Sequence, residues 1–337
     1  MKNFLFGVCV LSTALSSACF AAYREVDLPA NDIKFNSTNG MLYAAVPSSA
    51  GVGYGNRLVE ISPATGAIVR SVFVGSEPNV IGMSGDAEVA WVGLSGAPLV
   101  YPVDLSTMTV GTGFSLGSAM VFGPRYAEEI VVMQGSPNTV AISKRYHGVS
   151  PGFAGLSIYD SGVERPNADN STTGGNTIAF GSQPNTLYGF RNETSDYTLS
   201  RYTVSASGLA LSDSSQNQIY GQSYIITRGD TIFATSGQVV DGTLLQLLGR
   251  YSIPGAGFSE AVVIDDATSS VVFAVADKLY VFDRTTFVPT NSLVIPNSGF
   301  ALKATNCGSP SCVAVYYDSG KIFLISHVDS IFADGFE

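Results

Sequence analysis

Short apolar runs, each preceded by a tight polar turn, recur seven times along the chain. Successive copies start 40 to 51 residues apart. They begin at Leu42, Val89, Val140, Leu187, Ile232, Val272 and Val313. A period in the forties, with room for several short strands per unit, is typical of β-propeller blades. The pattern therefore predicts an all-β, seven-bladed propeller with four-stranded antiparallel blades.

We interpret each run as strand b of a blade whose strands a to d run outward from the axis. Strand a precedes it, at residues 32–36, 79–84, 128–134, 176–181, 223–228, 261–265 and 300–305. Strand c follows it, at residues 57–62, 99–105, 155–160, 197–204, 247–253, 278–283 and 321–327. Strand d is clear in three blades, at residues 67–75, 108–116 and 287–295.

The seventh unit has no strand d of its own after His327. Residues 23–29 near the N-terminus resemble the end of strand d in blade one, residues 71–75. An open ring would leave a sheet edge exposed, and pairing of the two ends removes that edge. We therefore predict that residues 22–28 pair with residues 321–327 and close the ring.

The first residues have the pattern of an export signal. Lys2 supplies a positive charge, residues 4–15 form a short apolar core, and small residues permit cleavage after Ala21. A buried N-terminal strand or a lipid anchor at Cys19 are the alternatives. We expect a secreted or periplasmic protein with a signal peptide (residues 1–21), a propeller (22–328) and an acidic-aromatic tail (329–337).

Cleavage would leave two of the four cysteines, Cys307 and Cys312. An even pair in an exported chain predicts a disulfide, here across a short turn. A metal site is the alternative, and it would need further ligands, for which His327 is the neighbouring candidate.

The composition limits the classes of partner that we expect. The chain has 17 basic and 27 acidic residues, for a net charge of −10, and no basic stripe. Nucleic acid and anionic membranes are therefore not expected partners. Beyond the N-terminus no apolar run approaches the ~20 residues that a membrane-spanning helix needs.

Residues 58–94 carry a family resemblance. The turn Ser62-Pro63-Ala64-Thr65-Gly66 and the segment Val74-Gly75-Ser76-Glu77-Pro78 are similar to the YVTN-type repeat of quinoprotein-like, WD40-like propellers. The terminal Y-V-T-N position reads Ala90-Trp91-Val92-Gly93 instead. The resemblance implies the propeller fold but no particular activity, because one fold serves many functions.

Loop lengths indicate where a partner would bind. The b–c connections are long in four blades, at residues 47–56, 144–154, 191–196 and 236–243. Long loops on one face of a rigid scaffold are a usual binding device, although solvated loops without a partner are the alternative. With the basic cluster 144–147 at the centre, the candidate residues are Tyr54, Asn56, Lys144, Arg145, Tyr146, His147, Asn192, Glu193, Asp196 and Asp241.

Catalytic motifs are not evident. His147 and His327 lie far apart, no G-x-S-x-G elbow occurs, and Trp91 is interpreted as a core residue. We therefore expect a monomeric, non-catalytic module without cofactor or metal that binds a protein or carbohydrate. The first alternative is a propeller-type hydrolase or lactonase with a site at the axial channel, and the second is a structural part of the cell surface. Polar residues near the ends of strand a, which the hydrolase would use, are Asp32, Asn79, Glu128, Asn176, Ser223 and Glu260.

Overall fold

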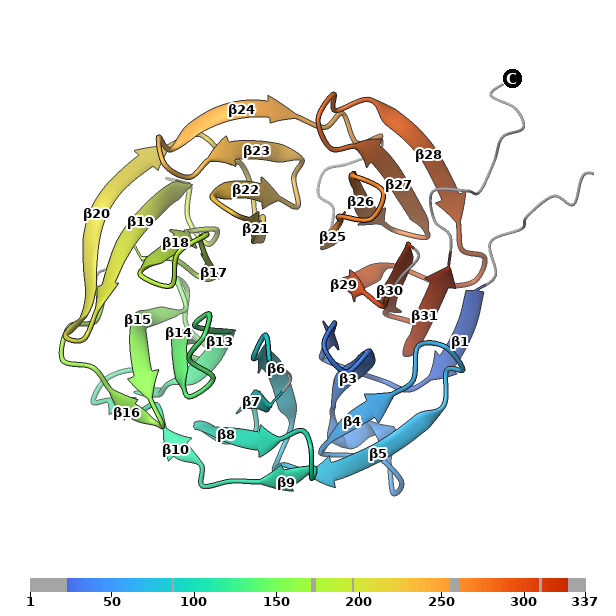
Figure 1. Cartoon of the computed structure of the whole chain (residues 1–337). Coiled ribbons are helices and arrows are strands. Elements are labelled where there is room, and N and C mark those ends of the chain that lie inside the picture. Colours follow the sequence, from blue (N-terminus) through green and yellow to red (C-terminus); the bar gives the residue numbers. More distant parts are fainter. Residues whose placement is uncertain are drawn as a thin grey trace, which may run out of the picture.

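The computed structural model describes residues 23–86, 88–170, 174–195, 197–254, 261–308 and 311–326. Seven antiparallel sheets stand around a central opening and confirm the predicted seven-bladed propeller (Figure 1). The expected signal peptide (1–21) and the tail (329–337) lie outside the described residues. Within the described part, no helix is long and apolar enough to cross a membrane.

In blades one to six the strands run outward from the axis in chain order. Blade one comprises β2 (Asp32–Asn36), β3 (Met41–Val46), β4 (Arg57–Ile61) and β5 (Ile68–Phe73). Blade two comprises β6 (Pro78–Met83), β7 (Val89–Leu94), β8 (Leu99–Asp104), β9 (Thr109–Val110) and β10 (Phe114–Ser115). Blade three comprises β13 (Tyr126–Val132), β14 (Thr139–Arg145), β15 (Phe153–Asp160) and β16 (Val163–Glu164). Blade four comprises β17 (Thr177–Phe180), β18 (Thr186–Phe190), β19 (Thr198–Ser205) and β20 (Gly208–Gln216).

The remaining blades follow the same plan. Blade five comprises β21 (Ile225–Arg228), β22 (Thr231–Ala234), β23 (Gln238–Asp241) and β24 (Gln246–Arg250). Blade six comprises β25 (Ala261–Asp265), β26 (Ser270–Val275), β27 (Lys278–Asp283) and β28 (Pro289–Val294). Blade seven comprises β29 (Ala301–Asn306), β30 (Cys312–Tyr317), β31 (Lys321–Ser326) and β1 (Tyr23–Asp27). A hairpin, β11 (Ser118–Ala119) and β12 (Gly123–Pro124), and a short 3₁₀ helix, η1 (Ser48–Ala50), lie between blade strands.

The two ends of the chain close the ring, as predicted. Strand β1 pairs antiparallel with β31, with Tyr23 opposite Ile325 and Asp27 opposite Lys321 (Figure 1). Val26 and Leu28 are buried in one core cluster with residues of blades seven and one. The N-terminal strand therefore covers the edge of β31 and adds apolar surface to the core.

Neighbouring blades pack their apolar faces against each other. Trp91 of blade two, for example, shares a core cluster with Ile130 and Val140 of blade three. The indole Nε1 of Trp91 donates a hydrogen bond to the carbonyl of Pro137 at 2.9 Å. The interpretation of Trp91 as a core residue is confirmed.

Side chains of the innermost strands also join adjacent blades. Oδ2 of Asp32 accepts a hydrogen bond from the backbone N–H of Ile81 at 2.9 Å. Oε2 of Glu129 accepts one from Ile178 at 2.6 Å. Innermost strands of different blades do not pair as sheets, so their buried N–H groups need such acceptors.

One strand assignment from the sequence is wrong. In blade five, strand c is β23, and residues 246–250 form strand d, whereas residues 247–253 were expected to be strand c. Gly237, at a φ of 93°, lets the chain turn directly from β22 into β23. Residues 236–243 are therefore not a long b–c loop, and β23 is too short to show an apolar pattern.

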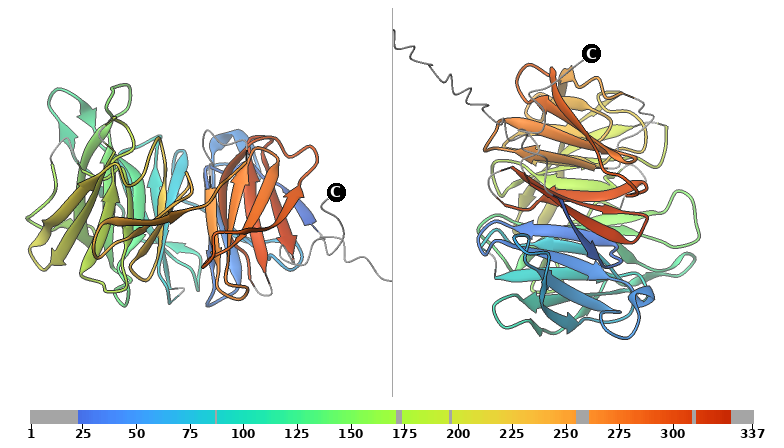
Figure 2. Two further views of the ribbon diagram at one scale, coloured as in Figure 1. Left: turned by 90° about the horizontal axis from the view of Figure 1, so that it is seen from above. Right: turned by 90° about the vertical axis from the view of Figure 1, so that its right-hand side faces the viewer.

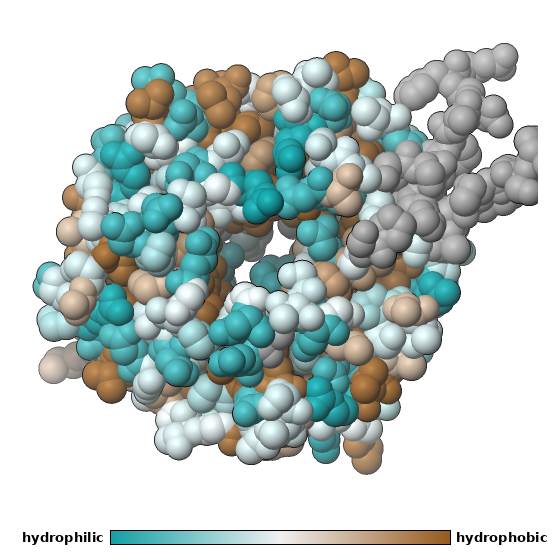
Figure 3. All heavy atoms as spheres, viewed as in Figure 1, coloured by the Kyte–Doolittle hydropathy of each residue, from teal (hydrophilic) through white to brown (hydrophobic). Residues whose placement is uncertain are grey.

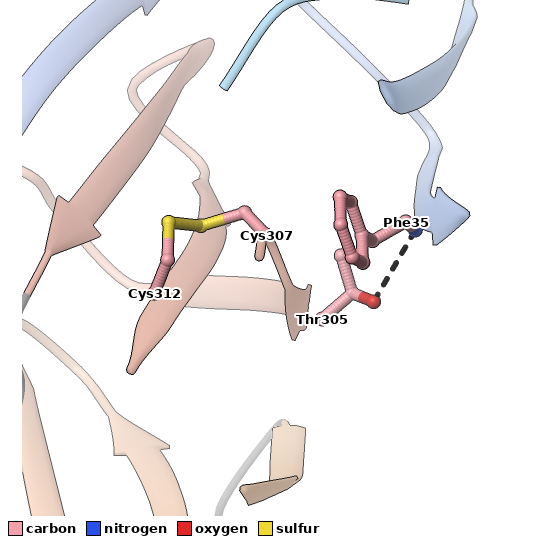
Figure 4. Close-up of a disulfide and its surroundings, with 4 residues drawn as sticks. All are labelled: Phe35, Thr305, Cys307 and Cys312. Atoms are coloured by element: carbon pink, nitrogen blue, oxygen red, sulfur yellow. Dashed lines mark hydrogen bonds between the residues drawn. A yellow bond between two sulfur atoms is a disulfide. The ribbon is translucent and has the colours of Figure 1, made fainter. Parts of the chain in front are cut away.

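The predicted disulfide is confirmed. Cys307 and Cys312 are bonded, with their Cα atoms 4.9 Å apart, and they link β29 to β30 across the a–b turn of blade seven (Figure 4). Near the bond, the backbone N–H of Phe35 in blade one donates to Oγ1 of Thr305 at 3.4 Å (Figure 4). The disulfide therefore lies where the last blade meets the first.

Candidate functional site

The connections between strands lie on two opposite faces of the ring. Because strands alternate in direction, the b–c and d–a connections lie on one face, here called the b–c loop face, and the a–b and c–d turns lie on the other. Hairpin β11–β12 is part of a d–a connection. It projects from the same side of the ring as the loop between β14 and β15 (Figure 2).

Exposed apolar side chains concentrate in the loops of the b–c loop face. The tip of hairpin β11–β12 carries three in succession, Met120, Val121 and Phe122, with Val121 82% and Phe122 54% exposed. Other loops on this face contribute Val52, Tyr54, Val149, Tyr220, Tyr224 and Phe300. Among the described residues, the loops of the opposite face contribute only Leu244 and Val288. Clustered apolar exposure is typical of interaction surfaces.

A groove of about 570 Å³ lies between this hairpin and blade three, and we call it the blade-three groove. It is lined by Phe122, Arg125, Lys144, Tyr146, Phe153, Ala154, Gly155, Glu164, Arg165, Pro166, Ala168 and Asn170. It exists because the outer strand of blade three is irregular. The backbone N–H of Arg165 bonds to Ile158 and that of Asp169 to Leu156, while residues 166–168 arch away between these two points.

Lys144 is a strand residue rather than the loop residue expected from the sequence. It belongs to β14, and its side chain is 1% exposed. Its Nζ donates to Oγ of Ser157 at 2.7 Å and to Oε1 of Glu164 at 3.0 Å. Burial lowers the pKa of Lys144, and the bond to Glu164 acts in the opposite direction. The side chain therefore lies at the base of the groove as a buried, hydrogen-bonded cation.

Tyr146 and Arg125 form the wall of the groove next to the hairpin. Nε of Arg125 donates to the hydroxyl of Tyr146 at 3.3 Å, and the rings of Phe122 and Tyr146 are 5.2 Å apart. Sequence reasoning identified Tyr146 but missed Arg125 and Phe122, because they lie in a d–a connection. The sequence does contain a signal for the hairpin, because Gly117 and Gly123 lie on either side of the apolar triplet and glycine is typical of tight turns. In the structure both glycines adopt positive φ.

Arg145, His147 and Glu193 connect neighbouring loops. Nη1 of Arg145 lies 2.8 Å from Oε2 of Glu128. Oε2 of Glu193, from blade four, accepts a hydrogen bond from the backbone of Phe153 at 2.9 Å. The ring of His147 stacks on Tyr126 at 3.8 Å, and burial, with the charge of Arg145, lowers its pKa. These side chains brace the edge of the groove toward the axis.

The other candidates lie away from the groove. Asn56 accepts a bond from the backbone of Glu77 at 2.8 Å, and Tyr54 lies in the same blade-one loop. Asn192 donates to the carbonyl of Ser223 at 3.1 Å. Asp241 ends β23 and accepts from Thr243 at 2.7 Å, which places it on the opposite face and corrects its assignment to a b–c loop. Asp196 lies outside the described residues.

Carboxylates do not converge on a metal-binding arrangement within the described ranges. Groups of three or more His, Cys, Asp or Glu side chains with suitable spacing for a cation are absent there. Asp32 is engaged with the backbone of Ile81, and Glu128 with Arg145. Glu260 lies outside the described residues.

Comparison with solved structures gives the fold. Hydrazine synthase of Kuenenia stuttgartiensis superposes with a TM-score of 0.69 at 10% identity, over 96% of this chain and 100% of that chain. The β-propeller domain of Cps50 (Swd1) from Myceliophteria thermophila gives 0.68 at 14% identity, over 89% of this chain and 96% of the other. No protein-family model and no curated protein sequence matches the chain. The chain is therefore a β-propeller by its fold.

Proposed function

We propose that this propeller is a non-catalytic binding module that engages a protein or a carbohydrate through its b–c loop face. The observation that supports the proposal is the coincidence, on one face, of the exposed hairpin tip and the blade-three groove. An apolar patch beside an arginine and a tyrosine has the composition of binding hot spots. The ion pair between the buried Lys144 and the exposed Glu164 fixes the floor of the groove, so that a partner meets a preformed surface.

The proposal also includes the repeat family of the propeller and the location of the protein. The turn and strand motifs of blades one and two support descent from the YVTN-type, quinoprotein-like repeat. The disulfide between Cys307 and Cys312 supports an oxidising location, either secreted or periplasmic. Export would place the b–c loop face where partners outside the cytoplasm can reach it.

Site-specific photo-crosslinking tests the binding face. A benzophenone amino acid is placed at Val121 on the hairpin tip and, as a matched control, at Leu244, which is 61% exposed on the opposite face. Both proteins are produced in the source organism and irradiated. We expect a discrete adduct from position 121 and none from position 244. Adducts from position 244 alone, or none from position 121 and none on a glycan array, would contradict the proposal.

A further inference from the structure

A second cavity lies in the axial channel, separate from the blade-three groove. It has a volume of about 320 Å³ and is bordered by the innermost strands β2, β6, β13, β17 and β21. The space-filling view shows the opening at the centre of the ring (Figure 3). Most of the lining is apolar, including Ile81, Met83, Val132, Ile178, Phe180 and Ile226. A concave, mostly apolar space with a few polar groups is the usual form of a small-molecule site.

Glu129 is the carboxyl group of this lining, and it also joins two blades. Its Oε2 accepts the backbone N–H of Ile178, which joins blade three to blade four. At the next junction, the hydroxyl of Thr177 accepts the N–H of Ile225 at 3.1 Å and does the same work. A carboxylate does so at the junction of blades one and two, where Asp32 accepts from Ile81. Glu129 therefore has a structural role, and in addition it faces the cavity, half-buried among apolar side chains where its ionised form is costly.

Burial raises the pKa of Glu129 to about 7, while Lys34, Lys303 and the bond from Ile178 act in the opposite direction. The carboxyl is therefore half protonated near neutral pH and serves as a hydrogen-bond donor below it. Glu128, a further charged group near the channel, forms an ion pair with Arg145.

Positive charge reaches the cavity from two lysines. Lys34 lines it, and its Nζ lies 4.0 Å from Oδ2 of Asp32, an oxygen that already accepts the N–H of Ile81. Nζ of Lys303 lies over the ring of Tyr224, 4.9 Å from its centroid. The ammonium of Lys34 in the lining, with the charge of Lys303 acting on Glu129 from outside it, favours an anion over a cation in this space.

We propose that the axial cavity binds a small apolar monocarboxylate, with its carboxylate at the ammonium of Lys34 and the carboxyl of Glu129 and its hydrocarbon part against the aliphatic lining. Binding in this mode takes up a proton at Glu129. Affinity therefore falls as the pH rises through neutrality. The site is independent of the b–c loop face, so either proposal stands or fails without the other.

Isothermal titration calorimetry with octanoate tests the site, with octylamine as the probe of opposite charge. We expect saturable binding of one octanoate per protein, up to about tenfold tighter at pH 6 than at pH 8, and no binding of octylamine. Titrations at pH 7 in two buffers of different ionisation enthalpy measure the proton uptake. Absence of saturable octanoate binding, or tighter binding of octylamine, would overturn the proposal.

Variants separate the site from nonspecific uptake. Lys34→Met is expected to weaken octanoate binding at least tenfold, whereas Lys278→Met, at an exposed position of blade six, leaves it unchanged. Glu129→Gln keeps an acceptor for Ile178 and a donor for the ligand, so it is expected to bind equally at pH 6 and pH 8. If Glu129→Gln does not fold, the comparison of Lys34→Met with Lys278→Met still tests the proposed site. Equal affinities of Lys34→Met and Lys278→Met would refute the assignment.

Discussion

Removal of residues 22–28 tests whether the N-terminal strand holds the ring together. The deletion exposes the edge of β31 and removes the buried side chains of Val26 and Leu28. Burial of one such side chain contributes about 1.5–3 kcal/mol, so the deletion is expected to cost about 3–6 kcal/mol. Domains of this kind have total stabilities of about 5–15 kcal/mol. The truncated protein should therefore retain a much smaller free energy of unfolding.

Urea denaturation followed by tryptophan fluorescence measures this effect far from the cut. Trp91 is the single tryptophan and is buried in blade two. We expect its transition to shift to lower urea in the truncated protein and to stay in place in Arg24→Ala, which changes an exposed residue of the same strand. An unchanged Trp91 transition after truncation would show that β1 is a frayed addition and would refute cooperative closure.

Three further predictions concern the core and the channel. Gly82→Ala is expected to destabilise the protein by about 1–3 kcal/mol, because a Cβ there would lie 2.5 Å from Cγ2 of Ile130. The control Gly85→Ala has open space around it and should change the urea midpoint little. Equal midpoints of the two variants would contradict the tight packing of blades two and three. Replacing Cys307 and Cys312 together by alanine is expected to lower the free energy of unfolding by about 2 kcal/mol, because the unfolded chain is no longer restricted by the short closed loop. An unchanged melting temperature would show that the bond does not stabilise the fold. Because the pKa of Glu129 is raised to about 7 in the folded protein, the contribution of this group to stability should fall as the pH rises from about 4.5 to 7. Glu129→Gln should remove this part of the pH dependence, and parallel stability profiles of the two proteins would contradict it.

The repeated apolar runs predicted the blades because strand b is buried on both faces and its pattern is strong. The N-terminal closure was also predictable, since an unpaired edge of β31 needs a partner. The prediction for blade five is wrong because β23 has four residues and follows a short three-residue turn that ends in Gly237. A strand this short has no period of its own, and the tertiary pairing with β22 defines it.

The candidate site was only partly accessible from sequence. Tyr146 was identified because aromatic and basic residues cluster in the loop that follows β14. Arg125 and Phe122 were missed because their approach to Tyr146 depends on the fold of hairpin β11–β12. The sequence predicts Lys144 in a loop, since a charged side chain in a strand gives no hint of its partners Ser157 and Glu164. The sequence does not single out Glu129, because its importance depends on the cavity that five different strands form around it.

The most direct test of the b–c loop face is the affinity of the partner captured at position 121. Binding of that purified partner, protein or glycan, is measured by biolayer interferometry for the unchanged protein and for Phe122→Ser, Tyr146→Ala and Leu244→Ser. We predict at least a tenfold loss of affinity for the first two variants and none for Leu244→Ser. Unchanged affinity in Phe122→Ser and Tyr146→Ala, with both variants folded, would contradict the assignment of binding to this face.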